Sequence, residues 1–246
     1  ADQIERREAL VWDKGRDDLV LRIETRLGGM LLDEQVRAAP AGSDTVAALI
    51  ERVRVTRLGA LGLAGSSGSS GSSLRARVAF LRRGLGDEWP DWSDAELLAS
   101  LDDWLAPYLV GATSAADLAR LDVDMLLSSQ LGWDGSVRLA ELAPTHLDTP
   151  SGRSAPIDYS RDIVTASVRV QDLFGLREHP CVADGRVPIA LELLSPADRP
   201  IQITSDLPGF STGTWADVRK DMAGRYPKHQ WPTDPATADP KRLKPR

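Results

Sequence analysis

The sequence has 246 residues, of which 42% are hydrophobic and 27% are charged. These proportions are typical of globular proteins, so they exclude a fibrous chain and a wholly disordered one. The formal net charge of −6 argues against a protein that binds nucleic acid over its whole surface. Cys181 is the only cysteine, which excludes a disulfide within this sequence and a thiolate zinc site, and favours the reducing cytoplasm.

Neither a secretion signal nor a membrane span is predicted. No run reaches the ~18 apolar residues that a membrane-spanning helix needs, and no charged segment followed by an apolar core opens the chain. We therefore expect a cytoplasmic location and no membrane partner. The chain begins with Ala1 and not with methionine, so we expect it to be part of a longer protein.

Residues 1–37 are predicted to form a small β element. Leu19, Leu21 and Ile23 alternate with their neighbours after a turn-like segment at 14–17, which is typical of a hairpin. A helical block is predicted over residues 43–143. Its first helix has the apolar spacing of one buried face, and either Ser43 or Asp44 can cap it.

Two further helix starts in this block have capping sequences. Ser93 and Glu96 have the spacing of a capping box, and Ser114 and Asp117 form a second cap. A helix predicted from residue 74 to residue 85 also carries several arginines. We interpret them as a solvated helix face, with a phosphate-binding stripe as the alternative. These arginines are Arg75, Arg77, Arg82 and Arg83.

Residues 65–73 repeat Gly-Ser-Ser three times. This composition is typical of a flexible linker, because it offers nothing to bury and nothing to recognise. We interpret it as engineered, with a natural low-complexity loop as the alternative. Either way, the segment carries no chemistry.

Residues 144–232 are predicted to form an α+β domain. A hairpin is expected over residues 145–159, an alternating strand over 187–193 with its return at 201–203, and a helix over about 215–223. The segment 165–173 fits a helix or a strand, and we favour a helix. Residues 233–246 are predicted to be a flexible basic tail, ending in the cationic run from Lys241 to Arg246.

The predicted fold class is therefore α+β. It comprises an N-terminal β-hairpin element, a central helical block, and a C-terminal antiparallel sheet crossed by a helix.

Several motifs of the second half resemble one protein family. The run from Arg186 to Pro196, the segment 199–207, and the closing segment from Val218 to Pro235 are similar to the end of HrpB-type proteins. Ala143-Pro144-Thr145-His146-Leu147 and Arg26-Leu27-Gly28 agree with this. The chain thus resembles the C-terminal region of the HrpB family of DEAH-box ATP-dependent RNA helicases. It departs from the family at Phe210-Ser211, where a tryptophan is frequent and where Trp215 is expected to supply the aromatic surface.

This resemblance implies two motor domains that bind ATP and Mg²⁺ elsewhere in a full-length protein. The present sequence has no Gly-x-x-x-x-Gly-Lys-Ser/Thr loop to hold phosphates and no Asp-Glu-Ala-His box. We therefore expect no cofactor and no ATP hydrolysis for this chain alone, and motor domains as its partner in cis. The function implied is an accessory one, guiding nucleic acid or positioning the motor.

The candidate site is the stretch 219–231, where cations alternate with rings. Cations for phosphate and rings for base stacking are the ingredients of single-stranded RNA or DNA binding. The alternative is that the cations pair with acidic residues while the rings fix the segment by burial. The candidate residues are Arg219, Lys220, Arg225, Tyr226, Lys228, His229 and Trp231.

Two other functions remain as alternatives. The acidic balance also suits a protein interaction platform without direct contact to nucleic acid. A hydrolase built on His146, Asp148 and Ser151 is remote, because no nucleophile elbow or oxyanion motif accompanies them. We expect His146 to make a hydrogen bond within its hairpin, and we predict neither a catalytic residue nor a metal site.

Overall fold

The structure is a computed structural model, and it describes residues 4–63 and 70–240. The described chain folds into two compact units, each built from two stretches of sequence. Unit 1 comprises the residues up to Arg75 together with Pro90–Trp133. Unit 2 comprises Ala76–Trp89 together with the residues from Asp134 onward. Within the described ranges, no helix is long and apolar enough to cross a membrane.

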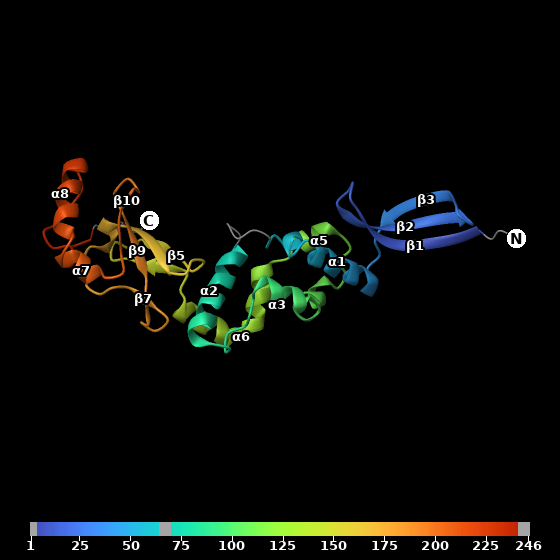
Figure 1. Ribbon diagram of the computed structural model, residues 1–246, viewed down its shortest axis with the longest axis horizontal. Coiled ribbons are helices and arrows are strands. Elements are labelled where there is room, and N and C mark those ends of the chain that lie inside the picture. The colour runs from blue at the N-terminus through green and yellow to red at the C-terminus, as the bar shows by residue number, and fades with distance from the viewer. Residues whose placement is uncertain (1–3, 64–69, 241–246) are drawn as a thin grey trace. The chain divides into compact units, whose positions relative to one another are not determined.

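Unit 1 begins with a three-stranded antiparallel sheet in the order β1-β2-β3 (Figure 1). The strands are β1 (Ile4–Asp13), β2 (Asp18–Leu27) and β3 (Met30–Ala38). The predicted hairpin is present, and a third strand extends it. Leu19, Val20 and Ile23 are buried, all on the central strand. Because β1 and β3 contain no buried residue, this sheet holds little of the core.

The turn between β1 and β2 connects this sheet to the helices of unit 1. Asp17 accepts hydrogen bonds from the indole of Trp12 at 2.9 Å and from Arg52 of α1 (Ser43–Val55) at 2.8 Å. The Arg52 guanidinium also lies 4.3 Å from the centre of the Trp12 ring. Asp18 accepts the backbone N–H of Ala115 at 2.7 Å. These contacts hold the sheet at its turn end.

The helices of unit 1 are short and enclose a leucine-rich core. Besides α1, they are η1 (Gly59–Leu61), α3 (Asp94–Ala99), α4 (Leu101–Trp104), η2 (Ala106–Leu109), α5 (Ala115–Ala119) and the first part of α6 (Val123–Leu142). Burial of apolar surface is the main stabilising contribution here. The core leucines that are almost completely buried include Leu49, Leu101, Leu105, Leu109, Leu118 and Leu127.

Of the predicted caps, the one at Ser114 is confirmed, and the capping box at Ser93 is only half formed. The cap predicted at Ser43 or Asp44 is wrong, because Gly42 is the N-cap of α1 and no side chain caps it. The Ser93 hydroxyl accepts the Glu96 N–H at the start of α3. The Ser93 N–H, however, donates to Asp91 and not to Glu96. Ser114 and Asp117 form a reciprocal capping box at the start of α5, so two otherwise unpaired helix N–H groups find acceptors. A cap needs only residues within one turn, which is why the sequence alone predicts it.

Two helices pass from one unit into the other. Helix α2 (Ser70–Leu85) begins inside the Gly-Ser-Ser segment, whose residues 65–69 lie outside the described residues. Helix α6 is interrupted at Gly132, whose φ of 66° is accessible to glycine at little cost. The sequence favoured a solvated face for the arginines of α2. Arg83 is exposed, but Arg75 and Arg82 are only partly exposed and Arg77 is buried, so they do not form one solvated face.

Arg77 shows why that expectation was wrong. Its side chain is buried in unit 2 and donates hydrogen bonds to the carbonyls of Ala143 at 2.6 Å and Leu139 at 3.3 Å. Burial lowers the pKa of its guanidinium. Arg75 pairs with Asp94. The sequence does not reveal such bonds, because the acceptors are backbone carbonyls more than 60 residues away.

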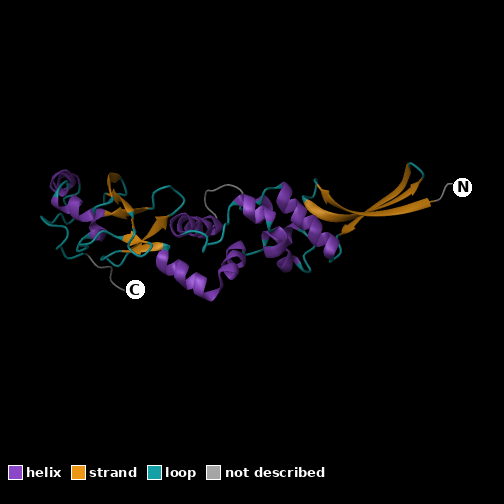
Figure 2. Cartoon of the chain, turned by 60° about the horizontal axis from the view of Figure 1, so that its bottom comes forward, coloured by secondary structure: helices purple, strands orange, loops and turns teal. Residues whose placement is uncertain are grey.

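The C-terminal part of unit 2 contains a five-stranded sheet in the order β10-β9-β6-β5-β4. This sheet is among the orange arrows near the C-terminus in Figure 2. Its strands are β4 (His146–Asp148), β5 (Ser154–Asp158), β6 (Thr165–Arg169), β9 (Ala190–Leu194) and β10 (Pro200–Thr204). The fold class α+β is confirmed. The sheet is mixed, however, because β6 and β9 run parallel whereas the other pairs are antiparallel.

The sequence favoured a helix over residues 165–173, and this prediction was wrong. The segment forms β6 and then one 3₁₀ turn, η3 (Val170–Leu173). Ala166 and Val168 are buried and alternate with more exposed neighbours, so period-two burial between β5 and β9 determines the strand. The predicted hairpin over 145–159 is confirmed. The predicted return at 201–203 is present in β10, but the strand predicted over 187–193 is split, because Val187–Pro188 pair with Cys181–Val182 and only residues from Ala190 onward pair with β10.

The remaining elements of unit 2 lie near the chain's end. A small hairpin pairs β7 (Cys181–Val182) with β8 (Val187–Pro188). Two helices follow β9 and β10 along the chain. The first, α7 (Leu207–Thr212), was not predicted, and the second, α8 (Trp215–Arg225), was predicted. Residues 241–246, which include the predicted cationic end, lie outside the described residues.

Candidate nucleic-acid interface

All seven candidate residues lie on α8 or in the turn that follows it. Helix α8 buries Trp215 and Met222 and exposes its other face. It ends at Arg225, and the backbone N–H of the next residue, Tyr226, donates to the Met222 carbonyl at 2.7 Å. The chain then turns through Pro227 and reaches Trp231. The candidate residues are therefore close in space as well as in sequence.

An aromatic cluster holds this segment against unit 2. Trp215 is 1% exposed and packs edge to face against Phe174 and Phe210, with ring centres 5.8 and 6.0 Å away. Trp231 lies 6.1 Å from Trp215 on another side. We call Phe174, Phe210, Trp215 and Trp231 the Trp215 cluster. Trp215 thus lies beside Phe210, as expected from the sequence, but it packs in the interior and presents almost no exposed surface.

Hydrogen bonds to the backbone fix the indole rings of this cluster. Trp215 donates its ring N–H to the Pro232 carbonyl at 3.0 Å, and Trp231 donates to the Tyr226 carbonyl at 2.9 Å. The segment after Pro232 continues along unit 2, where the Gly175 N–H donates to the Pro235 carbonyl at 2.9 Å. Both ends of the turn are thus held by the fold.

Two of the three candidate rings are half-buried by contacts within the protein. Tyr226 is half-buried, and its hydroxyl lies 3.5 Å from the Ser195 hydroxyl. Trp231 is half-buried in the Trp215 cluster. His229 is exposed and stands edge-on to Tyr226, with ring centres 6.2 Å apart. Of the three, only His229 presents an exposed ring.

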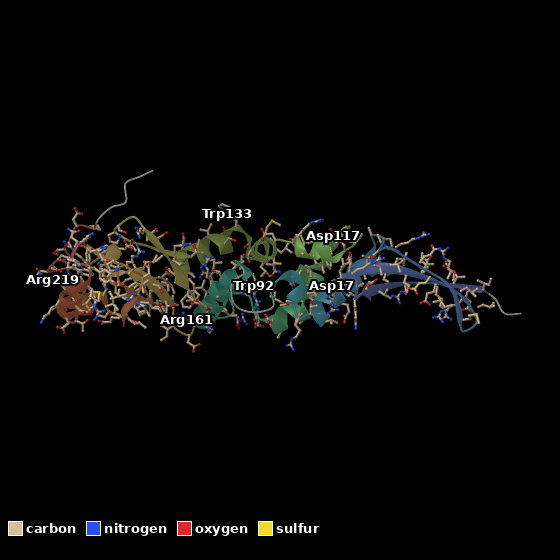
Figure 3. All side chains as sticks on the ribbon, turned by 90° about the horizontal axis from the view of Figure 1, so that it is seen from above. Asp17, Trp92, Asp117, Trp133, Arg161 and Arg219 are labelled. Atoms are coloured by element: carbon tan, nitrogen blue, oxygen red, sulfur yellow. The ribbon has the colours of Figure 1, made fainter. Side chains whose placement is uncertain are left out.

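The four candidate cations are all exposed. Arg219, labelled in Figure 3, donates to the Trp231 carbonyl at 3.0 Å, and Arg225 pairs with Asp221 of its own helix at 3.1 Å. Lys220 and Lys228 form no ion pair with any described residue. The segment therefore presents cations on a backbone that aromatic packing holds in place. Asp217 and Asp221 lie on the same helix and weaken its positive potential.

A histidine that the sequence analysis did not single out supports the helix before α8. The Nε2 atom of His179 lies 2.8 Å from the Ile189 carbonyl, and its Nδ1 accepts the Leu207 N–H at 3.1 Å. Leu207 is the first residue of α7. The pair of bonds requires Nδ1 without a proton and Nε2 with one. No sequence signal could have found this role, since the partners are 10 and 28 residues away.

The residues of the remote hydrolase interpretation form no catalytic arrangement among the described residues. The His146 ring bonds to Thr145 at 3.0 Å, within the hairpin as expected. Ser151 is buried and lies 3.0 Å from the Thr149 hydroxyl. No group of three or more His, Cys, Asp or Glu side chains in the described ranges is arranged to hold a metal ion.

Comparison with known proteins places the chain in a family. Residues 104–235 match the family HrpB_C, described as ATP-dependent helicase C-terminal. The chain is 36% identical over 241 residues to the ATP-dependent RNA helicase HrpB of Escherichia coli (strain K12). That alignment covers 97% of this chain and 29% of the relative.

Two solved structures are similar over nearly the whole chain. The crystal structure of the Escherichia coli DExH-box NTPase HrpB has a TM-score of 0.80 and 34% identity, covering 98% of this chain and 30% of that one. A second, of the Escherichia coli DEAH/RHA helicase HrpB, has a TM-score of 0.68 and 32% identity, covering 93% and 29%. This chain thus spans less than a third of the length of these relatives. It belongs to the HrpB family of ATP-dependent helicases, as their C-terminal region.

Proposed function

We propose that this chain is a non-catalytic accessory region of a cytoplasmic ATP-dependent RNA helicase, and that α8 and its turn guide single-stranded nucleic acid along the enzyme. The name of the Escherichia coli relative supports the activity of the whole protein. ATP and Mg²⁺ would be bound by motor domains in cis, because this sequence has neither phosphate-binding motif.

One observation carries the nucleic-acid part of the proposal. Arg219, Lys220, Arg225 and Lys228 are exposed on a segment whose backbone is fixed by the Trp215 cluster. A cation held on a rigid backbone loses less conformational freedom when it meets a phosphate than one on a mobile tail. The guiding surface therefore needs no rearrangement to bind.

The contact would involve mainly phosphates. Two of the three candidate rings already pack within the protein, so His229 alone remains to stack on a base. Phosphate contacts carry no sequence information, whereas base contacts do. We therefore expect binding that is independent of sequence, similar for RNA and DNA, and sensitive to salt.

Binding of a fluorescent ~20-nucleotide single-stranded RNA, followed by anisotropy at several salt concentrations, tests this proposal. The test variant is Lys220→Glu/Lys228→Glu, because these two side chains have no ion-pair partner among the described residues and leave the Trp215 cluster intact. The matched control is Lys14→Glu/Arg16→Glu, the same change of charge at an exposed turn of unit 1.

Each lost phosphate contact should reduce the slope of log affinity against log salt by about 0.7. We expect weaker binding and a smaller slope in the test variant and little change in the control. If both variants lose binding equally, the effect reflects net charge and the surface on α8 is not the guide. If the unaltered protein does not bind even at low salt, positioning of the motor domains becomes the better account of this region.

A further inference from the structure

Unit 1 contains a groove that is unrelated to the surface on α8. It lies between α4, η2 and α6 and has a volume of about 400 Å³. Pockets that hold small ligands or anchor side chains have volumes of roughly 300–1,000 Å³. Tyr108 and Pro107 are its exposed apolar lining residues, and Trp104 and Leu126, which are 4% and 2% exposed, lie beneath them. Asp103, Ser129 and Gln130 provide polar groups.

Hydrogen bonds hold the walls of the groove in place. The Trp104 indole donates to the Leu97 carbonyl at 3.0 Å, which fixes the ring from behind. The Tyr108 and Ser129 hydroxyls lie 3.3 Å apart and connect η2 to α6. The Gln130 side-chain oxygen accepts the indole N–H of Trp92 at 3.1 Å. A binding site formed in advance avoids the cost of ordering its own side chains.

Large apolar side chains are exposed on the same elements. Tyr108 is 46% exposed on η2, and Val110 directly after it is 84% exposed. Met125 is 59% exposed beside Leu126 on α6, and Trp133, labelled in Figure 3, is 82% exposed. A protein surface that concentrates exposed apolar residues commonly binds another protein. Methionine and tyrosine are typical of such surfaces.

The charge around the groove determines which partner fits. The sequence from Pro90 to Trp133 contains eight acidic residues and a single basic one, Arg120, a formal balance of −7 that arginines from outside this segment reduce by pairing with Asp94 and Asp102. Asp103 lines the groove, is exposed, and forms no ion pair with any described residue. Its neighbour Asp102 pairs with Arg54. This potential repels phosphates and attracts lysine and arginine.

We propose that this groove binds a basic amphipathic peptide segment of a protein partner. An apolar side chain of the segment enters the groove against Tyr108 and Pro107, and a flanking lysine or arginine pairs with Asp103. This is the mode in which an amphipathic helix places its apolar face into a complementary groove. The inference does not depend on the nucleic-acid surface of unit 2.

The probe is a fluorescent 14-residue peptide of leucine, lysine and alanine with the leucines on one helical face. A shuffled peptide of the same composition spreads them over all faces, and a third peptide has glutamate for lysine. Anisotropy with the intact chain measures affinity for each. The variants are Asp103→Lys and Tyr108→Ala, and the control is Asp44→Lys. Asp44, like Asp103, is an exposed acid in the first turn of a helix, but it does not line the groove.

We expect the amphipathic peptide to bind more tightly than the shuffled one, and the acidic peptide to show no binding. Asp103→Lys and Tyr108→Ala should each weaken binding at least about fivefold, and Asp44→Lys less than about twofold. Circular dichroism checks that each variant is folded. Equal binding of ordered and shuffled peptides, or equal losses in Asp103→Lys and Asp44→Lys, would overturn the proposal. So would competition by single-stranded RNA with the peptide for binding to the unaltered chain.

Discussion

The two sheets of this protein use the same kinds of residue in different ways. In the C-terminal sheet, β9 carries Leu191 and Leu193, both completely buried. In the N-terminal sheet, β3 carries Leu31 and Leu32, which are 44% and 48% exposed. One sheet therefore contains a core of its own. The other is held mainly at its turn end, through Asp17, Asp18 and their helical partners.

This difference teaches that strand propensity and stability are separate properties. Both sheets have regular ladders, because residues with good strand propensity pair wherever neighbouring strands satisfy their backbone groups. Only the C-terminal sheet also buries many apolar side chains, and this burial supplies most of the stability. Mutations should therefore cost much in one sheet and little in the other.

The largest effect is expected at the Trp215 cluster. Trp215→Ala should lower the free energy of unfolding of unit 2 by about 3–5 kcal/mol, because a buried aromatic side chain leaves a cavity that the surroundings fill only in part. Urea denaturation followed by circular dichroism measures this. Trp133→Ala, at a tryptophan that is 82% exposed, is the control and should change stability by less than about 0.5 kcal/mol.

Leu191→Ala in β9 should cost about 2–4 kcal/mol, because the side chain has no exposed surface and its loss creates a cavity in the sheet's core. The same urea experiment applies. A cost under about 1 kcal/mol would contradict the view that the C-terminal sheet carries the core of unit 2.

Asp18→Ala should cost about 1 kcal/mol, because the backbone N–H of Ala115 would lose its acceptor. Native-state hydrogen exchange of β1 and β2 is the informative measurement. We expect faster exchange throughout the N-terminal sheet, because the bond between Asp18 and Ala115 holds the turn end of the sheet to α5. Unchanged exchange would show that other contacts hold the sheet.

Asp117→Asn should cost about 0.5–1 kcal/mol at neutral pH through loss of charge in the capping box of α5. Hydrogen bonds from the Thr113 backbone and from Ser114 lower the pKa of Asp117. A lowered pKa in the folded state contributes stability above the unfolded pKa of about 4, and this contribution is lost as pH falls through the folded value. The difference between protein and variant should therefore shrink between about pH 5 and pH 2, as thermal melts across that range will show.

The smallest effect is expected at the exposed part of the N-terminal sheet. Leu32→Thr should change stability by less than about 0.5 kcal/mol, because the side chain is 48% exposed and threonine keeps strand propensity. Thermal melting of this variant beside Leu191→Ala compares the two sheets directly. Similar losses in both would show that β3 buries more than its exposure indicates.

Local features of this fold could be predicted from the sequence. The caps at Ser93 and Ser114 depend on residues three positions apart, and the hairpin over 145–159 depends on one turn. The stretch around α8 was likewise found from its own residues. The candidate site there stays a prediction until binding is measured, and the division into four segments stays one that limited proteolysis can test.

Features that depend on distant residues could not be predicted. The parallel pairing of β6 with β9 joins strands separated by a crossover of about 20 residues, and a local pattern does not reveal its direction. The burial of Arg77 depends on two carbonyls at the end of α6. The groove of unit 1 combines α4, η2 and α6, and the sequence indicates only that each is helical.

The interleaved connectivity of the two units has a consequence for biosynthesis. Residues 76–89 of unit 2 leave the ribosome before the 44 residues of Pro90–Trp133, which complete unit 1. Arg77 thus has to wait for Leu139 and Ala143, its partners more than 60 positions later. Unit 1 can finish folding first. Unit 2 has to combine its early residues 76–89 with residues that are made only after the intervening segment of unit 1. For the same reason, no single protease cut or truncation yields both units whole.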